Sequence, residues 1–195
     1  MVEINEKMPR CLGGYEEGVP ISQVDYIVEG ENPSLVPLPA SRSSDLDKKA
    51  AQFIIEEMCD DCCVQLGIGG MPNAVGKMIA ESDLKNLGCH TEMLVDAYID
   101  MYEAGRLTNS KKNIDPGKMV YAFALGTQRV YDFIDDNPQC AIFPVNYTNK
   151  PSIAALNDKL ITINNAIEVD LYGQVCAESS GTRIISGTGG QLDFV

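Results

Sequence analysis

Basic residues, histidine and long apolar runs are scarce in this chain. Lysine and arginine number 15 against 28 aspartates and glutamates, which gives a formal net charge of -13. Nucleic acids and anionic membranes are bound through clustered Lys and Arg, so this acidic chain is a poor candidate for either. No stretch of 18 apolar residues occurs, and the start, Met1 to Glu6, lacks the basic and apolar pattern of a signal peptide. We therefore expect a cytoplasmic protein without a membrane or nucleic-acid partner.

The shortage of histidine limits the metal sites and serine triads that the chain can form, because His90 is the only one. Cys59, Cys62 and Cys63 resemble half of a metal knuckle, but no second cysteine pair completes four ligands. We predict buried free thiols there and no metal site. The seven cysteines are odd in number and irregularly spaced, which suits a reducing compartment. The segment 178–181 is no nucleophile elbow, so a serine triad is not expected.

The order of apolar patterns predicts the fold class. A hydrophobic content of 45% and a charged content of 22% are ordinary for a soluble globular protein with one good core. Strands are predicted at 24–28, 63–66, 119–123 and 141–143, and helices from Ser44, from Pro72 to about Ser82, from Leu94 up to Gly105, and around 130–134. Alternating strands and helices indicate an α/β fold, a parallel sheet with helices on both faces. From Lys159 onward strands dominate, with a hairpin around Gly173.

Two helix starts carry capping signals. Ser44 is expected to cap the first helix, with Asp47 as its capping-box partner. Pro72 suits the first position of the helix that follows the glycine turn.

Two short segments concentrate the chemistry: Gly67-Ile68-Gly69-Gly70-Met71-Pro72, and His90-Thr91-Glu92-Met93. Glycines let a ligand approach the backbone, and amides at a helix start face an anion. A glycine turn can also be purely structural. A dinucleotide fingerprint would want an acidic residue about 20 positions on, which Glu92 could supply. It fits poorly, because Pro72 replaces the last glycine and Glu92 follows a histidine and a threonine.

These segments resemble the acetyl-CoA hydrolase/transferase family, in particular its butyryl-CoA and 4-hydroxybutyrate CoA-transferases. The resemblance covers nearly the whole chain. Its further segments are 123–126, 131–138, 163–171, 173–175 and 186–194.

The resemblance implies a division into domains. Residues 1–39 would be the end of an amino-terminal CoA-transferase domain, and residues 40–195 a carboxy-terminal domain truncated at its end, with the linker at 37–40. The chain is then expected to be a fragment of a homodimeric protein. Part of the acyl pocket would come from the missing domain, which leaves open whether the fragment is active.

The family mechanism implies a role for Glu92. Its carboxylate attacks an acyl-CoA to give a mixed anhydride, and the released CoA thiolate returns to form a glutamyl-CoA thioester. An incoming carboxylate such as acetate reverses these steps. Each step passes through an oxyanion, for which the glycine turns at 67–70 and 187–190 are the available donors.

The resemblance also assigns the binding residues. Gly67, Ile68, Gly69, Gly70 and Met71 match the first CoA-binding loop, Gly189 and Gly190 the second, and Asn149 and Ile167 positions near CoA. Coenzyme A is expected as a substrate, with no tightly bound cofactor, and the partners are an acyl-CoA and a short-chain carboxylate. A CoA-holding lysine would lie beyond Val195.

Several alternatives remain at this stage. Glu168 is a rival nucleophile, although its alternation with Ile167 and Val169 is typical of the solvent face of a strand. His90 is tempting as a general base, but anhydride chemistry requires no proton transfer, which favours a structural hydrogen bond. The same Glu92 could serve an acyl-CoA hydrolase, and a non-catalytic CoA-binding module would use the glycine turns alone. The acyl group, which could be butyryl or 4-hydroxybutyryl, is not determined.

Overall fold

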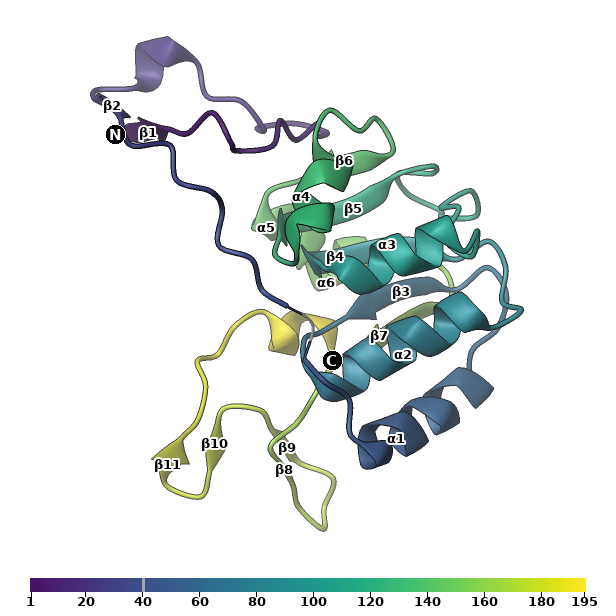
Figure 1. Cartoon of the computed structure of the whole chain (residues 1–195). Helices are drawn as coiled ribbons and strands as arrows, with labels where there is room; N and C mark the ends of the chain where they lie inside the picture. The colour runs from purple at the N-terminus through teal and green to yellow at the C-terminus, as the bar shows by residue number, and fades with distance from the viewer. Residues whose placement is uncertain (40) are drawn as a thin grey trace.

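The computed structural model describes residues 1–39 and 41–195 (Figure 1). Ala40, the last residue of the expected linker and the first of the expected carboxy-terminal domain, lies outside the described residues. The centre of the fold is a five-stranded sheet of order β6-β5-β4-β3-β7 in which every pairing is parallel. Its strands are β3 (Cys63–Leu66), β4 (Gly88–Leu94), β5 (Met119–Ala124), β6 (Cys140–Ile142) and β7 (Leu160–Ile163).

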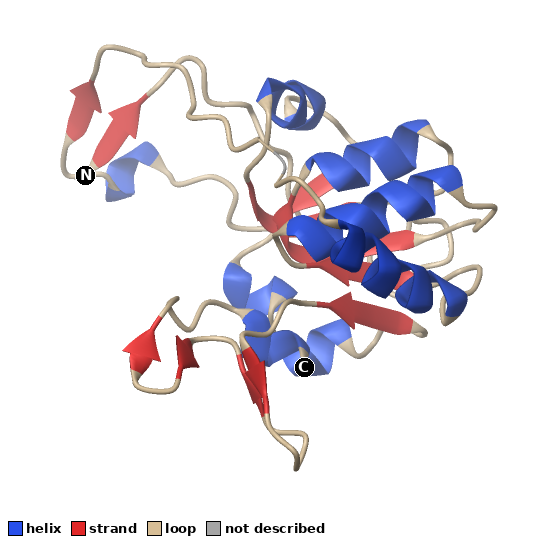
Figure 2. Cartoon of the chain, turned by 60° about the horizontal axis from the view of Figure 1, so that its bottom comes forward, coloured by secondary structure: helices blue, strands red, loops and turns tan. Residues whose placement is uncertain are grey.

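Helices cover both faces of this sheet (Figure 2), which confirms the predicted fold class. Neighbouring helices contact one another in one layer made of α1 (Asp45–Glu56), α2 (Gly70–Glu81), α3 (Asp96–Glu103) and α4 (Gln128–Ile134). The second face holds the short helices α5 (Val145–Thr148) and α6 (Pro151–Ala154). Parallel crossovers are right-handed, so strands added in one direction place their helices on one face. The return from β6 to β7 runs the opposite way and therefore crosses the other face.

The helix starts follow the capping chemistry of the sequence in part. The Ser44 hydroxyl accepts from the Asp47 amide at 3.1 Å, and the Asp47 carboxylate accepts from the Ser44 amide at 2.8 Å, which confirms the predicted capping box. The expectation for Pro72 was wrong by two residues. α2 begins at Gly70, because Gly69 takes a φ of 117° that suits glycine, and Pro72 is the third helical residue.

The sequence reading missed β4, the central strand. The sequence indicates only a connection before Glu92 and a helix from Leu94, but Leu94 is the last residue of β4 and the helix starts at Asp96. The pattern was misleading because His90 and Thr91 break the apolar run. Both are nevertheless fully buried, each with a hydrogen bond inside the protein. A central parallel strand is covered on both faces and shows no alternation of polar and apolar residues.

The two ends of the chain form small sheets beside the main one (Figure 1). β1 (Val2–Ile4) pairs in parallel with β2 (Ile27–Glu29), with the short 3-10 helix η1 (Ile21–Gln23) between them. The predicted strand at 24–28 is therefore shifted toward its end. The predicted hairpin around Gly173 is confirmed.

The carboxy-terminal part is built from short strands. They are β8 (Glu168–Val169), β9 (Val175–Cys176), β10 (Ser179–Ser180) and β11 (Arg183–Ile184), which form two antiparallel pairs, followed by the 3-10 helix η2 (Gln191–Phe194). Among the described residues, no helix is long and apolar enough to cross a membrane.

The core lies between the sheet and the layer of longer helices. Its fully buried side chains include Val64, Val75, Ile79, Leu94 and Met101. Gly76 of α2 faces Ala97 of α3, where an added Cβ would lie 2.5 Å from the Ala97 Cβ, so the two helices pack closely. This close packing holds the helix starts firmly at the carboxyl edge of the sheet.

The sheet splits between β3 and β4 at that edge. Their pairing stops at Val64 and Cys89, whereas β3 continues along β7 to Leu66 and β4 continues along β5 to Leu94. The Leu66 amide donates instead to the buried Tyr98 hydroxyl of α3 at 2.7 Å. A side chain therefore replaces a ladder bond where the two strands diverge, and the split separates the glycine turn from Glu92.

Replacing Tyr98 with phenylalanine is expected to destabilise this split. The Leu66 amide would remain buried without its partner, which costs about 1–3 kcal/mol of unfolding free energy. Urea unfolding followed by circular dichroism measures the change. Tyr102→Phe on the same helix is the control, because none of the hydrogen bonds among the described residues uses its hydroxyl, and we expect a change below about 0.5 kcal/mol. Equal effects of the two variants would contradict the assignment of this bond.

Candidate functional site

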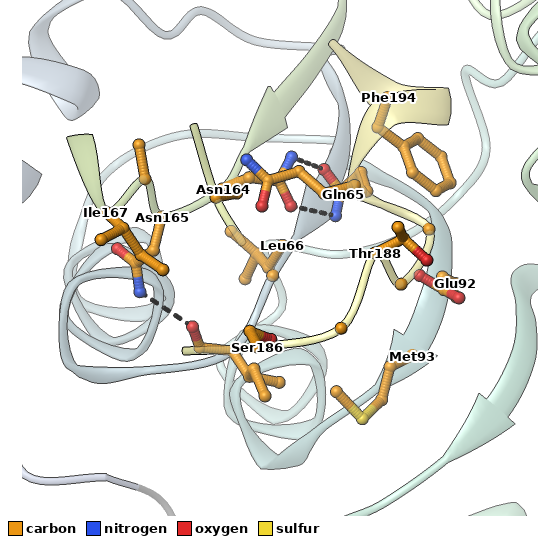
Figure 3. Close-up of a pocket in the computed structure, with 18 of the residues that line it drawn as sticks. Gln65, Leu66, Glu92, Met93, Asn164, Asn165, Ile167, Ser186, Thr188 and Phe194 are labelled. Atoms are coloured by element: carbon orange, nitrogen blue, oxygen red, sulfur yellow. Dashed lines mark hydrogen bonds between the residues drawn. The ribbon is translucent and has the colours of Figure 1, made fainter. Parts of the chain in front are cut away.

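The carboxyl ends of parallel strands meet at one edge of a sheet, where open α/β sheets bind their ligands. A cavity of about 400 Å³ lies at this edge (Figure 3). Strand ends supply Gln65, Leu66, Glu92, Met93 and Phe123, and the turn after β3 supplies Gly67 and Ile68. The chain after β7 supplies the rest: Asn164 to Ile167, Ala177, Ser186 to Gln191 and Phe194. Its volume lies in the range of small-molecule sites. The split between β3 and β4 thus opens into a candidate ligand site.

Glu92 is the carboxylate of this cavity. It lies two residues after His90 on β4, so both side chains point to the same face of the sheet, the one covered by α5. Its carboxylate lies against the Cα of Gly190: a Cβ added to Gly190 would be 2.6 Å from Glu92 Oε1 and closer still to Oε2. No side chain among the described residues donates a hydrogen bond to it. Glu92 is half-buried, and because its carboxylate has no side-chain donor in the described part of the chain, it is free to contact a ligand.

Asn149, the residue that follows α5, reaches the same point. Its Oδ1 accepts a hydrogen bond from the Thr148 hydroxyl at 3.1 Å, which fixes the direction of the amide. The Nδ2 atom then points toward Gly190 and Glu92, and it is buried without a partner among the described residues. Burying an unpaired amide is costly, so a donor left free in this position indicates a ligand or an intermediate that it serves.

The first glycine turn divides between this cavity and the surrounding structure. Gly67 and Ile68 line the cavity. Gly69 lines a separate recess on the far side of the turn. Gly70 packs against α1, since an added Cβ would lie 2.7 Å from an Asp47 oxygen, and Met71 packs partly buried against the core. The structure therefore brings two of the five predicted loop residues to Glu92, and the other three build the turn.

The second glycine turn closes the cavity from the opposite side. Gly189 and Gly190 both line it, together with Ile167 on the segment that follows β7. Gly189 has a φ of 53°, in the left-handed region, so the turn that carries Gly190 past Glu92 depends on a glycine. Residues of both glycine turns therefore line the space next to Glu92.

Sequence reasoning missed a pair of amides in the cavity wall. Gln65 Nε2 donates to Asn164 Oδ1 at 3.0 Å, and Asn164 Nδ2 donates to Gln65 Oε1 at 2.9 Å (Figure 3). The pair joins the ends of β3 and β7 directly before the Gly67 turn. The available signal was Gln65 itself, the one polar residue in an otherwise apolar buried strand.

The rival nucleophile Glu168 lies elsewhere. It is exposed on β8, outside the cavity lining, and its Oε1 accepts from the Ser180 hydroxyl at 2.7 Å and the Gly181 amide at 3.2 Å. These bonds show that the Glu168 carboxylate holds the two hairpins together and lies outside the cavity.

The cysteine cluster forms no metal centre among the described residues, where no group of three or more His, Cys, Asp or Glu side chains is placed to hold an ion. All seven cysteines are free thiols. Cys62 and Cys63 are buried as predicted, but Cys59 is exposed, because it follows the end of α1 in a surface turn.

Comparison with known proteins relates the chain to CoA-transferases. A family model described as the acetyl-CoA hydrolase/transferase C-terminal domain matches residues 126–195. The chain is 59% identical to butyryl-CoA:acetate CoA-transferase of Anaerostipes caccae, over all of this chain and 44% of that protein. It is 40% identical, with the same coverage, to the 4-hydroxybutyrate coenzyme A transferase of Clostridium kluyveri. The chain thus spans less than half the length of these curated relatives.

The fold agrees with these relationships. The crystal structure of RipA from Yersinia pestis superposes with a TM-score of 0.87 at 35% identity, over 98% of this chain and 42% of that one. The likeness in fold extends over nearly the whole chain, and the likeness in sequence extends through the segments that form the cavity. On these grounds, the chain belongs to the acetyl-CoA hydrolase/transferase family.

Proposed function

We propose that the protein transfers coenzyme A between an acyl-CoA, butyryl-CoA or 4-hydroxybutyryl-CoA, and a short carboxylate such as acetate. The relatives named above act on butyryl-CoA with acetate and on 4-hydroxybutyrate, according to their names. The observation that carries the proposal is the position of Glu92, a carboxylate between two glycine turns with an unpaired Asn149 amide beside it. This arrangement suits covalent chemistry at a carboxylate.

In the proposed mechanism, a Glu92 oxygen attacks the thioester carbonyl of the acyl-CoA. The carbon–sulfur bond breaks, the CoA thiolate leaves, and a mixed anhydride remains. The thiolate then attacks the glutamyl carbonyl and expels the acyl carboxylate, which leaves a glutamyl-CoA thioester. Acetate attacks this thioester and reverses both steps, so that acetyl-CoA leaves and the Glu92 carboxylate is restored. No step requires an added oxidant or a metal, and the thioester energy is kept.

Each attack creates a tetrahedral oxyanion beside Glu92. Donors placed where charge develops lower such barriers most. The Gly190 backbone lies against the Glu92 carboxylate, and the Asn149 Nδ2 hydrogens have no partner among the described residues. We assign both to the oxyanions formed at the Glu92 carbon. Gly67, Ile68, Gly189 and Ile167 would line the path of the CoA thiol, while Gly69, Gly70 and Met71 maintain the first turn.

The remaining parts of the proposal follow from family membership. Coenzyme A is a substrate, and no other cofactor is tightly bound. Residues 1–39 belong to an amino-terminal domain and 40–195 to a carboxy-terminal one, and the protein works as a cytoplasmic homodimer. Hydrolysis by the same Glu92 would differ only in the acceptor, water in place of acetate.

A trapping experiment tests the covalent intermediate. The protein is incubated with butyryl-CoA and reduced with borohydride, which converts a glutamyl thioester to an alcohol, and peptides are analysed by mass spectrometry. We expect the reduced residue at Glu92, and none in Glu92→Ala. Reduction at Glu168 instead would identify Glu168 as the nucleophile. If butyryl-CoA binds but no carboxylate is reduced, the covalent mechanism fails and the protein is a non-catalytic CoA-binding module. Acetyl-CoA formation that requires acetate separates transfer from hydrolysis.

A further inference from the structure

His90, fully buried on the central strand, holds the end of α5. Its Nε2 lies 2.8 Å from the Thr148 carbonyl oxygen. A carbonyl can only accept, so the ring nitrogen at this contact must carry the proton. The histidine therefore donates from β4 to the last residue of α5, across the layer between the sheet and this short helix.

The other ring nitrogen shows that this histidine is neutral. His90 Nδ1 is buried without a partner among the described residues, so a second proton there would have no acceptor. Burial is the largest effect and lowers the pKa of His90. The hydrogen bond to the Thr148 carbonyl opposes it less strongly, and the weaker effects of the Lys112 ammonium, which lowers the pKa, and of the Asp115 carboxylate, which raises it, come after these. The Tyr147 ring, which packs 6.5 Å away, donates its hydroxyl to Asp115. His90 thus donates one fixed hydrogen bond from Nε2, and its Nδ1 has no partner, among the residues that the structure describes, with which to exchange a proton.

The contact leads directly to the reactive carboxylate. Thr148 receives the bond from His90, its hydroxyl fixes the Asn149 amide, and Asn149 Nδ2 faces Glu92 and Gly190. α5 has only four residues, too few for a helix to hold its shape alone. Its position therefore depends on what it packs against, and His90 is the polar anchor below its last residue.

We propose that His90 is a positioning residue, whose Nε2–H anchors the end of α5 so that the Asn149 amide is aimed at the oxyanion formed on Glu92. The inference rests on the proposed covalent chemistry at Glu92. His90 itself touches no reacting atom. Losing the anchor lets Asn149 drift, which affects the transition state but leaves the cavity wall that receives CoA in place. The expected signature is a fall in kcat with little change in KM.

Two amide variants of His90 differ by one methylene and test this anchor. In His90→Gln the amide nitrogen reaches about as far as Nε2, and in His90→Asn it does not. We expect His90→Asn to lower kcat about 10- to 100-fold with KM for butyryl-CoA nearly unchanged. His90→Gln should recover to within about fivefold of the wild type. Both are assayed where circular dichroism shows a wild-type fold, and equal losses in the two would overturn the proposal.

Coupling to Asn149 provides the second measurement. If His90 acts through Asn149, the His90→Asn substitution should add almost nothing in an Asn149→Ala background, whereas independent effects would multiply. In ¹⁵N NMR of the histidine rings, the signals that disappear in His90→Gln are assigned to His90. We expect them to show a neutral ring protonated at Nε2. A neutral ring protonated at Nδ1, or full multiplication of the two kinetic losses, refutes the anchor.

These outcomes separate the two proposals. If borohydride labels Glu92 while the His90 variants show no coupling to Asn149, the positioning role alone fails. If Glu92→Gln keeps full transferase activity, the proposed function fails, whatever the tautomer of His90.

Discussion

Replacing Glu92 with glutamine is expected to lower kcat for transfer from butyryl-CoA to acetate by about 10⁴-fold or more, the loss seen when covalent nucleophiles are removed. Glutamine keeps the shape of the side chain beside Gly190 but cannot form the anhydride. Binding of butyryl-CoA should persist, because the glycine turns that line the cavity do not change. The measurement is steady-state acetyl-CoA formation, with calorimetry for binding.

Glu168→Gln is the matched control. Glu168 also lies in a distinctive segment, but it is exposed and accepts hydrogen bonds from Ser180 and Gly181 of the neighbouring hairpin. We expect activity within about twofold of the wild type, since exposed substitutions away from a site have small effects. A large loss in Glu168→Gln together with an active Glu92→Gln would exchange the two assignments.

Glu92→Asp gives an intermediate case. The carboxylate survives but is withdrawn by one methylene from Gly190 and Asn149, and misplacement of this size costs about 100-fold. An aspartyl thioester trapped with borohydride at this position would show that any carboxylate here can form the intermediate, and that its position sets the rate.

The general plan of the fold could be predicted from the sequence because its signals are local. β3, α2, β5 and α4 each combine an apolar pattern with a turn or cap, and the Ser44 capping box uses residues three apart. β4 failed for the opposite reason. Its buried His90 is paired with the Thr148 carbonyl, 58 residues later in the chain, and no local pattern contains that partner.

The same distinction applies to the site. Glu92 and the glycine turns stand in segments that resemble a family, so they could be named from the sequence. What makes them a site is long-range: the split between β3 and β4, the Gln65–Asn164 amide pair, and the approach of Gly190 to Glu92. The sequence likewise offered five glycine-turn residues as equals. Long-range contacts distinguish those that build the turn, such as Gly70 packed against Asp47, from Gly67 and Ile68, which face the cavity.

The second large effect is expected from Gly190→Ala. The added methyl group would lie 2.6 Å from Glu92 Oε1 and closer to Glu92 Oε2 and Asn149 Nδ2, all distances that real Cβ atoms do not reach. The backbone itself is unstrained by the change, since the φ of Gly190 is -103°. The methyl group must therefore push the carboxylate and the amide apart, and a shift of about 1 Å costs on the order of 100-fold in kcat.

Gly187→Ala in the same turn is the control for Gly190→Ala. Nothing lies within 4 Å of a Cβ added to Gly187, and its backbone is not in the left-handed region, so activity should stay near that of the wild type. Both variants should unfold at similar urea concentrations, because the turn lies outside the hydrophobic core. If Gly190→Ala were as active as Gly187→Ala, then Glu92 and Asn149 would not need to meet at Gly190. The covalent site would in that case have to be sought elsewhere along the carboxyl edge of the sheet.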